Sequence, residues 1–271
     1  FDQNGNAADG TWNRDAYINE RVTFDAGNAH QASANHHYHA NPPALRHQLG
    51  DSVDYDSATN IYTENFNGQH SPIIGWVRDG LPVYGPYGYS DPLDTTSNIR
   101  RMISGYQLRT DIAANDSARN SWPAWANRVY GDVGRSFVAG PNVGTNFPLG
   151  RYMEDNDYKG DLAGYSYYAS SAQDVFNESN HYDLNEYNAR WCITPEFPAG
   201  TWAYFTCMLP DGTPVYPYNI ARVFFGNPTG DDASAIPETD DTAATLITLF
   251  EGGPEKQETV EGIAIDDPAP N

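Results

Sequence analysis

The sequence has few lysines, few cysteines and no long apolar run. Only Lys159 and Lys256 are lysines, and 36 acidic residues against 15 basic ones give a net charge of -21. A field of that sign repels phosphate backbones, which excludes nucleic acid as a partner. No apolar run approaches the roughly 18–20 residues that cross a bilayer, so we expect no membrane insertion.

Motifs for several common chemistries are also missing. The sequence contains no Gly-x-Ser-x-Gly elbow, no phosphate loop and no dinucleotide fingerprint. It begins at Phe1, with neither Met nor a signal peptide, so we expect a processed, secreted product in the extracellular space or periplasm. Whether the chain is an enzyme stays open at this point.

The two cysteines, Cys192 and Cys207, lie fifteen residues apart across a predicted turn. A disulfide between them would bridge a hairpin and contribute about 3 kcal/mol of stability through loop closure. The alternative is a pair of buried free thiols. The expected export favours the disulfide.

Aromatic residues reach 13%, beside 24 Gly and 19 Pro, and this composition is typical of strands and turns. We predict a mainly β fold, with a compact sandwich- or barrel-like domain that is rich in loops. Apolar runs at 73–77 and 81–84 flank Asp79-Gly80, which predicts a hairpin. Residues 191–193 and 201–208 are expected to form a second strand pair.

Composition divides the chain into one domain, 1–226, and an acidic segment, 227–271. Within the domain, about 107–180 is rich in Gly, Asn and Tyr and weakly periodic, which indicates a long irregular insertion, either a substrate lid or decoration. The acidic segment holds eleven acids and one base, and we expect a tail or linker that docks only in part, through 243–250.

Histidines cluster in His36-His37-Tyr38-His39. In an extended strand His37 and His39 share one face, while His36 and Tyr38 share the other. Two imidazoles on one face, with a third from a neighbouring strand, suit copper or zinc. We predict a metal site of His37, His39 and His70, with His30 as a fourth ligand or a supporting group. The alternative is a hydrogen-bonded His/Tyr network that stiffens the core.

Three further groups are candidates for chemistry. Glu186 could orient one imidazole, and Tyr84 could line a pocket and transfer a proton, although such tyrosines commonly pack against proline. The segment 155–161 has Asp at its first and third positions and Gly at its sixth, like a calcium loop, but Lys159 stands at the fifth. Calcium is therefore a second ion to consider, against a solvated acidic turn.

Several long motifs follow one another along the chain. Together they cover roughly 11–90 and 181–226, and leave 107–180 and the acidic segment outside. The motifs are Thr23-Phe24-Asp25, His37-Tyr38-His39-Ala40, His70-Ser71-Pro72-Ile73-Ile74-Gly75-Trp76, Asp79-Gly80-Leu81-Pro82-Val83-Tyr84-Gly85-Pro86-Tyr87-Gly88-Tyr89, Asp183-Leu184-Asn185-Glu186-Tyr187-Asn188-Ala189-Arg190 and Pro198-Ala199-Gly200-Thr201-Trp202-Ala203-Tyr204-Phe205.

In these motifs the chain resembles the YHYH-domain family of exported proteins. Two positions depart from the family pattern: His36 stands where the first Tyr is usual, and Tyr187 stands where a Cys is usual. The resemblance implies an exported, mostly β protein and brings no settled activity. It also implies that a Cys192–Cys207 bridge would be particular to this chain.

Three hypotheses follow. The first is an exported protein with a His-rich transition-metal site, copper favoured over zinc, that acts as a metalloenzyme on a glycan-like or phenolic substrate. The second is a non-catalytic extracellular module for adhesion or surface self-assembly, stabilised by calcium. The third is metal capture without turnover.

Overall fold

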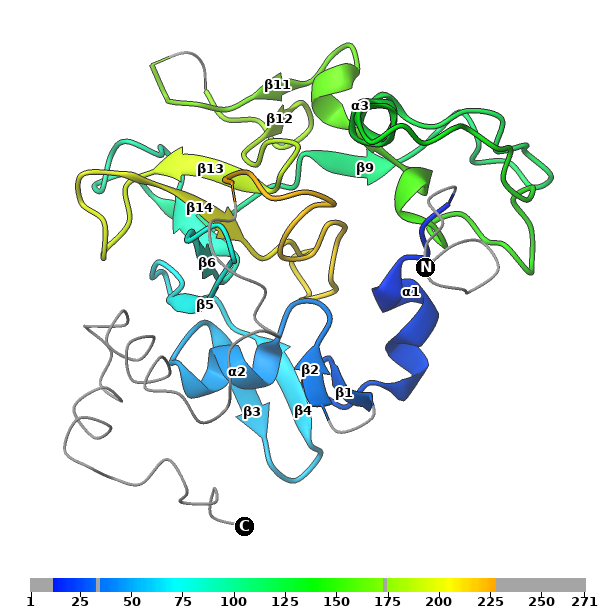
Figure 1. Cartoon of the computed structure of the whole chain (residues 1–271). Coiled ribbons are helices and arrows are strands. Elements are labelled where there is room, and N and C mark those ends of the chain that lie inside the picture. The colour runs from blue at the N-terminus through cyan, green and yellow to red at the C-terminus, as the bar shows by residue number, and fades with distance from the viewer. Residues whose placement is uncertain (1–11, 33–34, 173–174, 228–271) are drawn as a thin grey trace, which may run out of the picture. The chain divides into compact units, whose positions relative to one another are not determined.

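A computed structural model describes residues 12–32, 35–172 and 175–227 (Figure 1). Strands make up 24% of it and helices 14%, which confirms the predicted mainly β class. Within these ranges the strands form several small sheets and no closed barrel, and loops connect them. The acidic segment falls outside the described residues from 228 onward, so its predicted docking stays a prediction.

The largest sheet among the described residues has four strands in the order β13-β14-β6-β5. Its β5 (Ile73–Trp76) and β6 (Pro82–Tyr84) form the hairpin predicted around Asp79-Gly80. The backbone of Gly80 has φ +82°, a conformation that glycine adopts without strain. The second predicted pair, β13 (Ala189–Cys192) and β14 (Thr201–Phe205), is antiparallel, and β14 runs parallel to β6. Two distant stretches of the chain therefore meet in one sheet.

Five two-stranded sheets surround this one in the described ranges. Four are antiparallel, and the sheet of β11 with β12 is parallel. The pairs are β1 (Ala29–Ala32) with β2 (Asn35–Tyr38), β3 (Val53–Asp56) with β4 (Ile61–Glu64), β7 (Tyr87–Tyr89) with β8 (Ile99–Arg101), β9 (Tyr106–Leu108) with β10 (Asn156–Tyr158), and β11 (Ser166–Tyr167) with β12 (His181–Tyr182).

The helices are short. Helix α1 (Ala16–Glu20) begins after Asp15, whose carboxylate accepts the backbone N–H of Ile18 at 3.1 Å and so caps the helix. A 3-10 turn, η1 (Arg21–Thr23), continues it. The remaining helical elements are α2 (Pro43–Gln48), α3 (Ala124–Asp132), η2 (Met153–Asp155) and η3 (Lys159–Asp161).

The segment predicted as an irregular insertion contains an aromatic core despite its weak periodicity. Trp122, Trp125, Tyr130 and Tyr152 pack there together with Trp12 from the start of the described chain. A fully buried ion pair lies in the same segment: the Nε of Arg119 donates to Asp155 Oδ1 at 2.6 Å, and its Nη2 donates to Oδ2 at 2.8 Å. Much of the segment is therefore packed structure rather than surface decoration.

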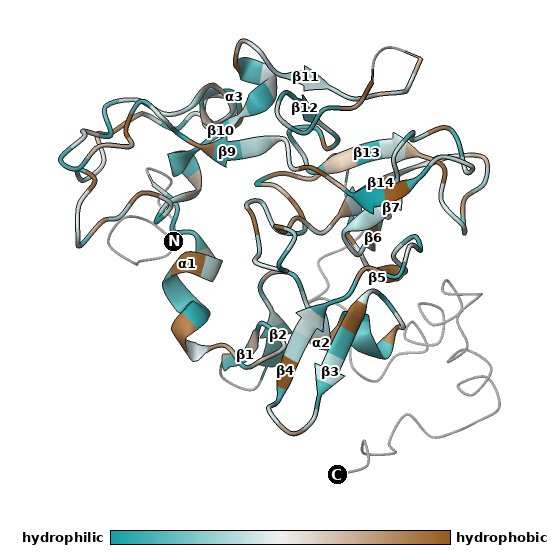
Figure 2. Ribbon diagram, turned by 180° about the vertical axis from the view of Figure 1, so that it is seen from behind, coloured by the Kyte–Doolittle hydropathy of each residue, from teal (hydrophilic) through white to brown (hydrophobic). Residues whose placement is uncertain are grey.

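Hydrophobic residues are interspersed with hydrophilic ones along the ribbon (Figure 2). Among the helices in the described ranges, none has the length and apolar character of a membrane span. The buried residues gather in separate clusters, and those around the four-stranded sheet include Tyr84, Phe205, Val83 and Tyr204.

Candidate metal centre

The β1–β2 hairpin brings three histidines together. Its register pairs His30 with His37, and His39 follows directly after the end of β2. As predicted, His37 and His39 share a face, with ring centroids 4.6 Å apart. His36 points to the other face, where its Nε2 lies 3.2 Å from Asp25 Oδ2. The period-two geometry of a strand explains this division.

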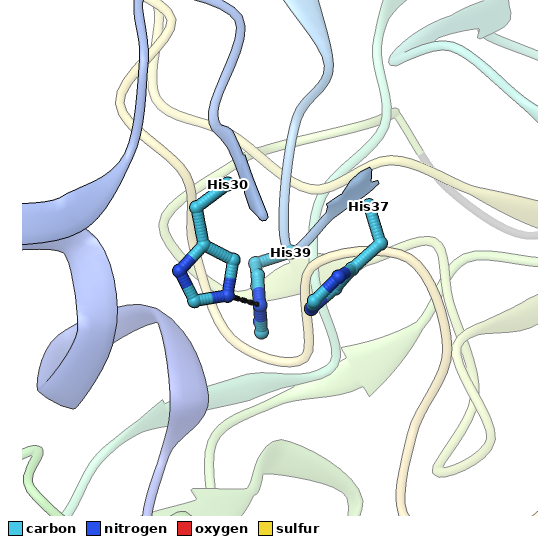
Figure 3. A group of neighbouring side chains, drawn as sticks. All are labelled: His30, His37 and His39. Carbon is cyan, nitrogen blue, oxygen red and sulfur yellow. Dashed lines mark hydrogen bonds between the residues drawn. The ribbon is translucent and has the colours of Figure 1, made fainter. Parts of the chain in front are cut away.

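Figure 3 shows the three imidazoles turned toward one another. One ring nitrogen of each of His30, His37 and His39 lies within 4.8 Å of the others, and all three residues are half-buried. The Nε2 atoms of His30 and His39 are 2.9 Å apart. Two imidazole nitrogens this close need a proton or a cation between them, because their lone pairs repel each other.

Hydrogen bonds fix which nitrogen faces the centre. The hydroxyl of Thr23 donates to the carbonyl of Glu20 at 2.7 Å, so it accepts from His30 Nδ1, also at 2.7 Å. His30 then carries its proton on Nδ1 and presents a lone pair at Nε2. His37 Nδ1 donates to the carbonyl of Asn35 at 3.3 Å, which likewise leaves its Nε2 free to bind. Partners of this kind are what orient histidine ligands at metal sites.

An acidic residue that the sequence analysis did not single out completes the group. Glu20, the last residue of α1, places Oε2 3.4 Å from the Nε2 atoms of both His30 and His39. The ring of Phe24 stacks on His39 with centroids 4.7 Å apart and meets His30 edge-on at 5.1 Å. The centre therefore holds three imidazoles and a carboxylate against an aromatic wall.

Burial shifts the protonation of one ring toward the form that binds metals. It lowers the pKa of His39, the neighbouring His37 and His30 lower it further, and Glu20 opposes them. The net direction is downward, so His39 is neutral at neutral pH. Neutral imidazole is the form that ligates metal ions.

His70, predicted as a ligand, is not part of this group. It lies under the four-stranded sheet among Tyr84, Tyr89 and Phe205, with ring centroids 5.1, 5.1 and 6.0 Å away. Its Nδ1 donates to the carbonyl of Ser71 at 2.8 Å, while its buried Nε2 has no hydrogen-bond partner among the described residues. Desolvation lowers its pKa. The expectation that His70 converges on His37 and His39 is corrected: His70 lies just ahead of β5, and β5 belongs to a different sheet from β2.

The two catalytic candidates also lie elsewhere. Tyr84 is fully buried, and its hydroxyl donates to Glu196 Oε2 at 2.8 Å and lies 2.9 Å from Thr194 Oγ1. Burial raises its pKa well above the ordinary tyrosine value. Glu186 accepts from Arg128 Nη2 at 2.6 Å, so the ion pair replaces the predicted contact with an imidazole. Neither side chain is positioned to act at the histidine group.

Two of the three carboxylates in the calcium-loop-like segment 155–161 are paired with arginines. Asp155 is bound by Arg119, and Asp161 accepts from Arg128 at 2.8 and 3.1 Å.

The predicted disulfide is also not formed. Cys192 and Cys207 are buried free thiols. The thiol of Cys207 lies against the side chain of Asn188, with Sγ 3.1 Å from Oδ1. Burial raises their pKa values to about 11 and about 12.

A cavity of about 360 Å³ opens beside the histidine group. His39 forms part of its wall, and most of the other wall atoms are apolar. At one end the hydroxyl of Tyr218 donates to Asp15 at 2.7 Å. The aromatic and apolar lining residues include Tyr17, Tyr38, Val83, Tyr216, Tyr218 and Ile220.

The chain matches one family of known proteins. The sequence model described as YHYH protein aligns with residues 1–216, a span that contains β1, β2 and all three clustered histidines. It also runs through the segment 107–180. No curated protein and no solved structure matches significantly. The chain belongs to the YHYH protein family.

Proposed function

We propose that His30, His37 and His39 hold a transition-metal ion, with Glu20 as a fourth ligand or as a base beside it. The observation that carries this proposal is the 2.9 Å separation of the His30 and His39 Nε2 atoms, with a His37 ring nitrogen and Glu20 Oε2 close by. Thr23 and Asn35 hold the Nδ1 atoms of His30 and His37, so the Nε2 atoms of these two residues need little reorganisation to bind.

Copper is the preferred ion and zinc the second choice. Imidazole suits both metals, and a given nitrogen site binds Cu²⁺ more tightly than the other divalent first-row ions. Calcium is a poor match for this group because it prefers six to eight oxygen ligands. Three imidazoles and one carboxylate leave room for a further ligand in a five-coordinate site.

The adjacent cavity favours a metalloenzyme over a protein that only captures metal. A capture site needs only the ligands, whereas here one ligand, His39, also lines an apolar cavity with several tyrosine rings. Of the two substrate classes predicted from the sequence, the phenolic one matches this apolar wall better than a glycan does. The ion would supply Lewis-acid or redox chemistry, and Glu20 could accept a proton from a substrate hydroxyl near His39.

Export is part of the same proposal. The YHYH family is one of exported proteins. We place this chain outside the cytoplasm, in the extracellular space or the periplasm. A metal site there would take up its ion from the medium rather than from a cytosolic carrier.

Elemental analysis of the purified protein tests the proposal. Wild type, dialysed against equimolar copper and zinc, should retain about one ion per chain. The His37→Ala/His39→Ala variant should retain none. His36→Ala is the matched control, because it removes a histidine of the same strand on the opposite face, and it should bind as wild type does. The proposal fails if wild type retains no copper or zinc, or if His36→Ala loses the ion too. Full binding without turnover on a panel of phenols would leave metal capture as the function.

A further inference from the structure

The opposite face of β2 borders a second, smaller pocket of about 180 Å³. It lies between the β1–β2 hairpin, the start of α2 and the tip of the β3–β4 hairpin. Its lining residues are Asp25, Ala26, Gly27, Tyr38, Ala44, Asn60 and Tyr62. None of the three clustered histidines is among them, although Tyr38 also lines the larger cavity beside His39.

Two tyrosine rings give this pocket a rigid wall. Tyr62 stacks on its cross-strand partner Tyr55, with centroids 4.6 Å apart and planes at 27°, and His47 packs against both. Tyr38, which is 40% exposed, meets His36 edge-on. Rings held in this way lose little freedom when a ligand packs against them.

The polar groups of the pocket are unused or only partly used. Among the described residues, the hydroxyls of Tyr38 and Tyr62 and the amide nitrogen of Asn60 have no hydrogen-bond partner, while Asn60 Oδ1 accepts from Tyr55. Asp25 Oδ1 accepts the N–H groups of Gly27 and Ala29, and Oδ2 faces His36, which leaves acceptor capacity on Oδ2. The pocket thus offers two hydroxyls, one amide donor and one carboxylate.

Charge narrows the class of ligand. Partial burial would raise the pKa of Asp25, but its hydrogen bonds from His36, Ala29 and Gly27 outweigh burial and lower it, so the group is ionised. That carboxylate and the net charge of -21 oppose an anionic ligand. One carboxylate alone is a weak cation site. The arrangement suits a neutral molecule with many hydroxyls and an apolar C–H face.

We propose that this pocket binds a neutral saccharide. The C–H face of one pyranose ring would stack on Tyr62 or Tyr38, and its hydroxyls would donate to Asp25 and accept from Asn60 and the phenols. The volume admits about one ring, so further units of a chain would extend into solvent. The site would anchor the protein to a polysaccharide independently of any metal at the histidine group.

Calorimetric titration of the whole chain with neutral methyl pyranosides and their β-linked disaccharides tests the proposal. At least one probe should bind with a Kd of about 1 mM or tighter. Tyr62→Ala should raise that Kd about tenfold or more, because it removes the stacking surface. Asn60→Gly should raise it severalfold, and glycine tolerates the backbone φ of +56° at this position.

The controls separate this site from the metal centre. Trp76→Ala removes an aromatic ring, 47% exposed, that lies outside the pocket, and should leave the Kd unchanged. Chelator and His37→Ala/His39→Ala should also leave it unchanged, whatever the outcome of the metal analysis. The proposal is overturned if no probe binds at about 50 mM, if folded Tyr62→Ala and Asn60→Gly both bind as wild type does, or if binding needs the histidines.

Discussion

The four histidines weighed as metal ligands lie in two different surroundings in this molecule. His30, His37 and His39 sit at a hairpin edge, half-buried, with a nitrogen of each turned toward the others, and Glu20 lies beside His30 and His39. His70 sits in an aromatic core with one nitrogen bonded to a backbone carbonyl and the other unpaired within the described ranges. The comparison teaches that a histidine in a motif becomes a ligand candidate through its neighbours: converging nitrogens mark the first group, and packed rings mark the second.

The largest expected difference is in metal affinity. Removing two of the three clustered imidazoles in His37→Ala/His39→Ala should weaken copper binding by more than about 100-fold, beyond the 10- to 100-fold cost of losing a supporting group. His70→Ala should leave the affinity within about twofold. Competition titrations against a chelator of known affinity measure both. A similar loss of copper affinity in the two variants would contradict the distinction between a ligand group and a core histidine.

Stability should show the reverse order. His70→Ala opens a cavity among Tyr84, Tyr89 and Phe205 and frees the carbonyl of Ser71, so we expect a loss of about 2–3 kcal/mol in the free energy of unfolding. His37→Ala, at the hairpin edge, should cost less than about 1 kcal/mol. Urea unfolding in the presence of a chelator gives both values. Equal losses would contradict the division into a site and a core.

The comparison can be sharpened at Thr23, whose hydroxyl holds His30 Nδ1. Thr23→Val keeps the branched shape but removes that acceptor, so copper affinity should fall about 10- to 100-fold. Thr23→Ser keeps the hydroxyl and should bind within about threefold of wild type. The same competition titration applies. If Thr23→Val binds like wild type, the tautomer of His30 is not fixed by this residue.

The smallest expected effect is a dependence of stability on pH. Desolvation lowers the pKa of His70 in the folded chain, with a smaller lowering by Arg190, against opposing contributions from Glu196 and Asp51 and its hydrogen bond to Ser71. The His70 imidazole therefore binds a proton more tightly in the unfolded chain than in the folded one. The free energy of unfolding is highest above the ordinary histidine pKa of about 6.5 and falls as pH drops below it.

His70→Phe keeps a ring at this position and removes its titration. In metal-free protein the free energy of unfolding of wild type should therefore fall more steeply between pH 7 and pH 5 than that of His70→Phe. Chemical unfolding at several pH values measures the two slopes. Identical slopes would mean that the His70 environment does not disfavour its charged form.

The parts of the site that could be predicted are those set by local geometry. Strand alternation was enough to place His37 and His39 on one face and His36 on the other. The turn residues Asp79-Gly80 were enough to predict the β5–β6 hairpin. Both depend only on neighbours in sequence, which a pattern of residue types reports directly.

The parts that could not be predicted depend on tertiary packing. Glu20 reaches the histidines from a helix of only five residues, too short for a periodic signal, and no spacing links it to His30 or His39. His70 lies ahead of β5, whose sheet partners are β6, β14 and β13 rather than β2, and sheet membership is not written in local sequence. For the same reason Cys207 neighbours Asn188 instead of forming the expected bridge with Cys192.

The central claim is that three imidazoles of the β1–β2 hairpin region bind one transition-metal ion. X-ray absorption at the copper edge, on wild-type protein loaded with one equivalent of copper, tests it most directly. The account predicts a first shell with three imidazole nitrogens at about 2.0 Å, lost in His37→Ala/His39→Ala and unchanged in His70→Ala. A shell made of oxygen alone, or one that changes with His70 and not with His37 and His39, would contradict it.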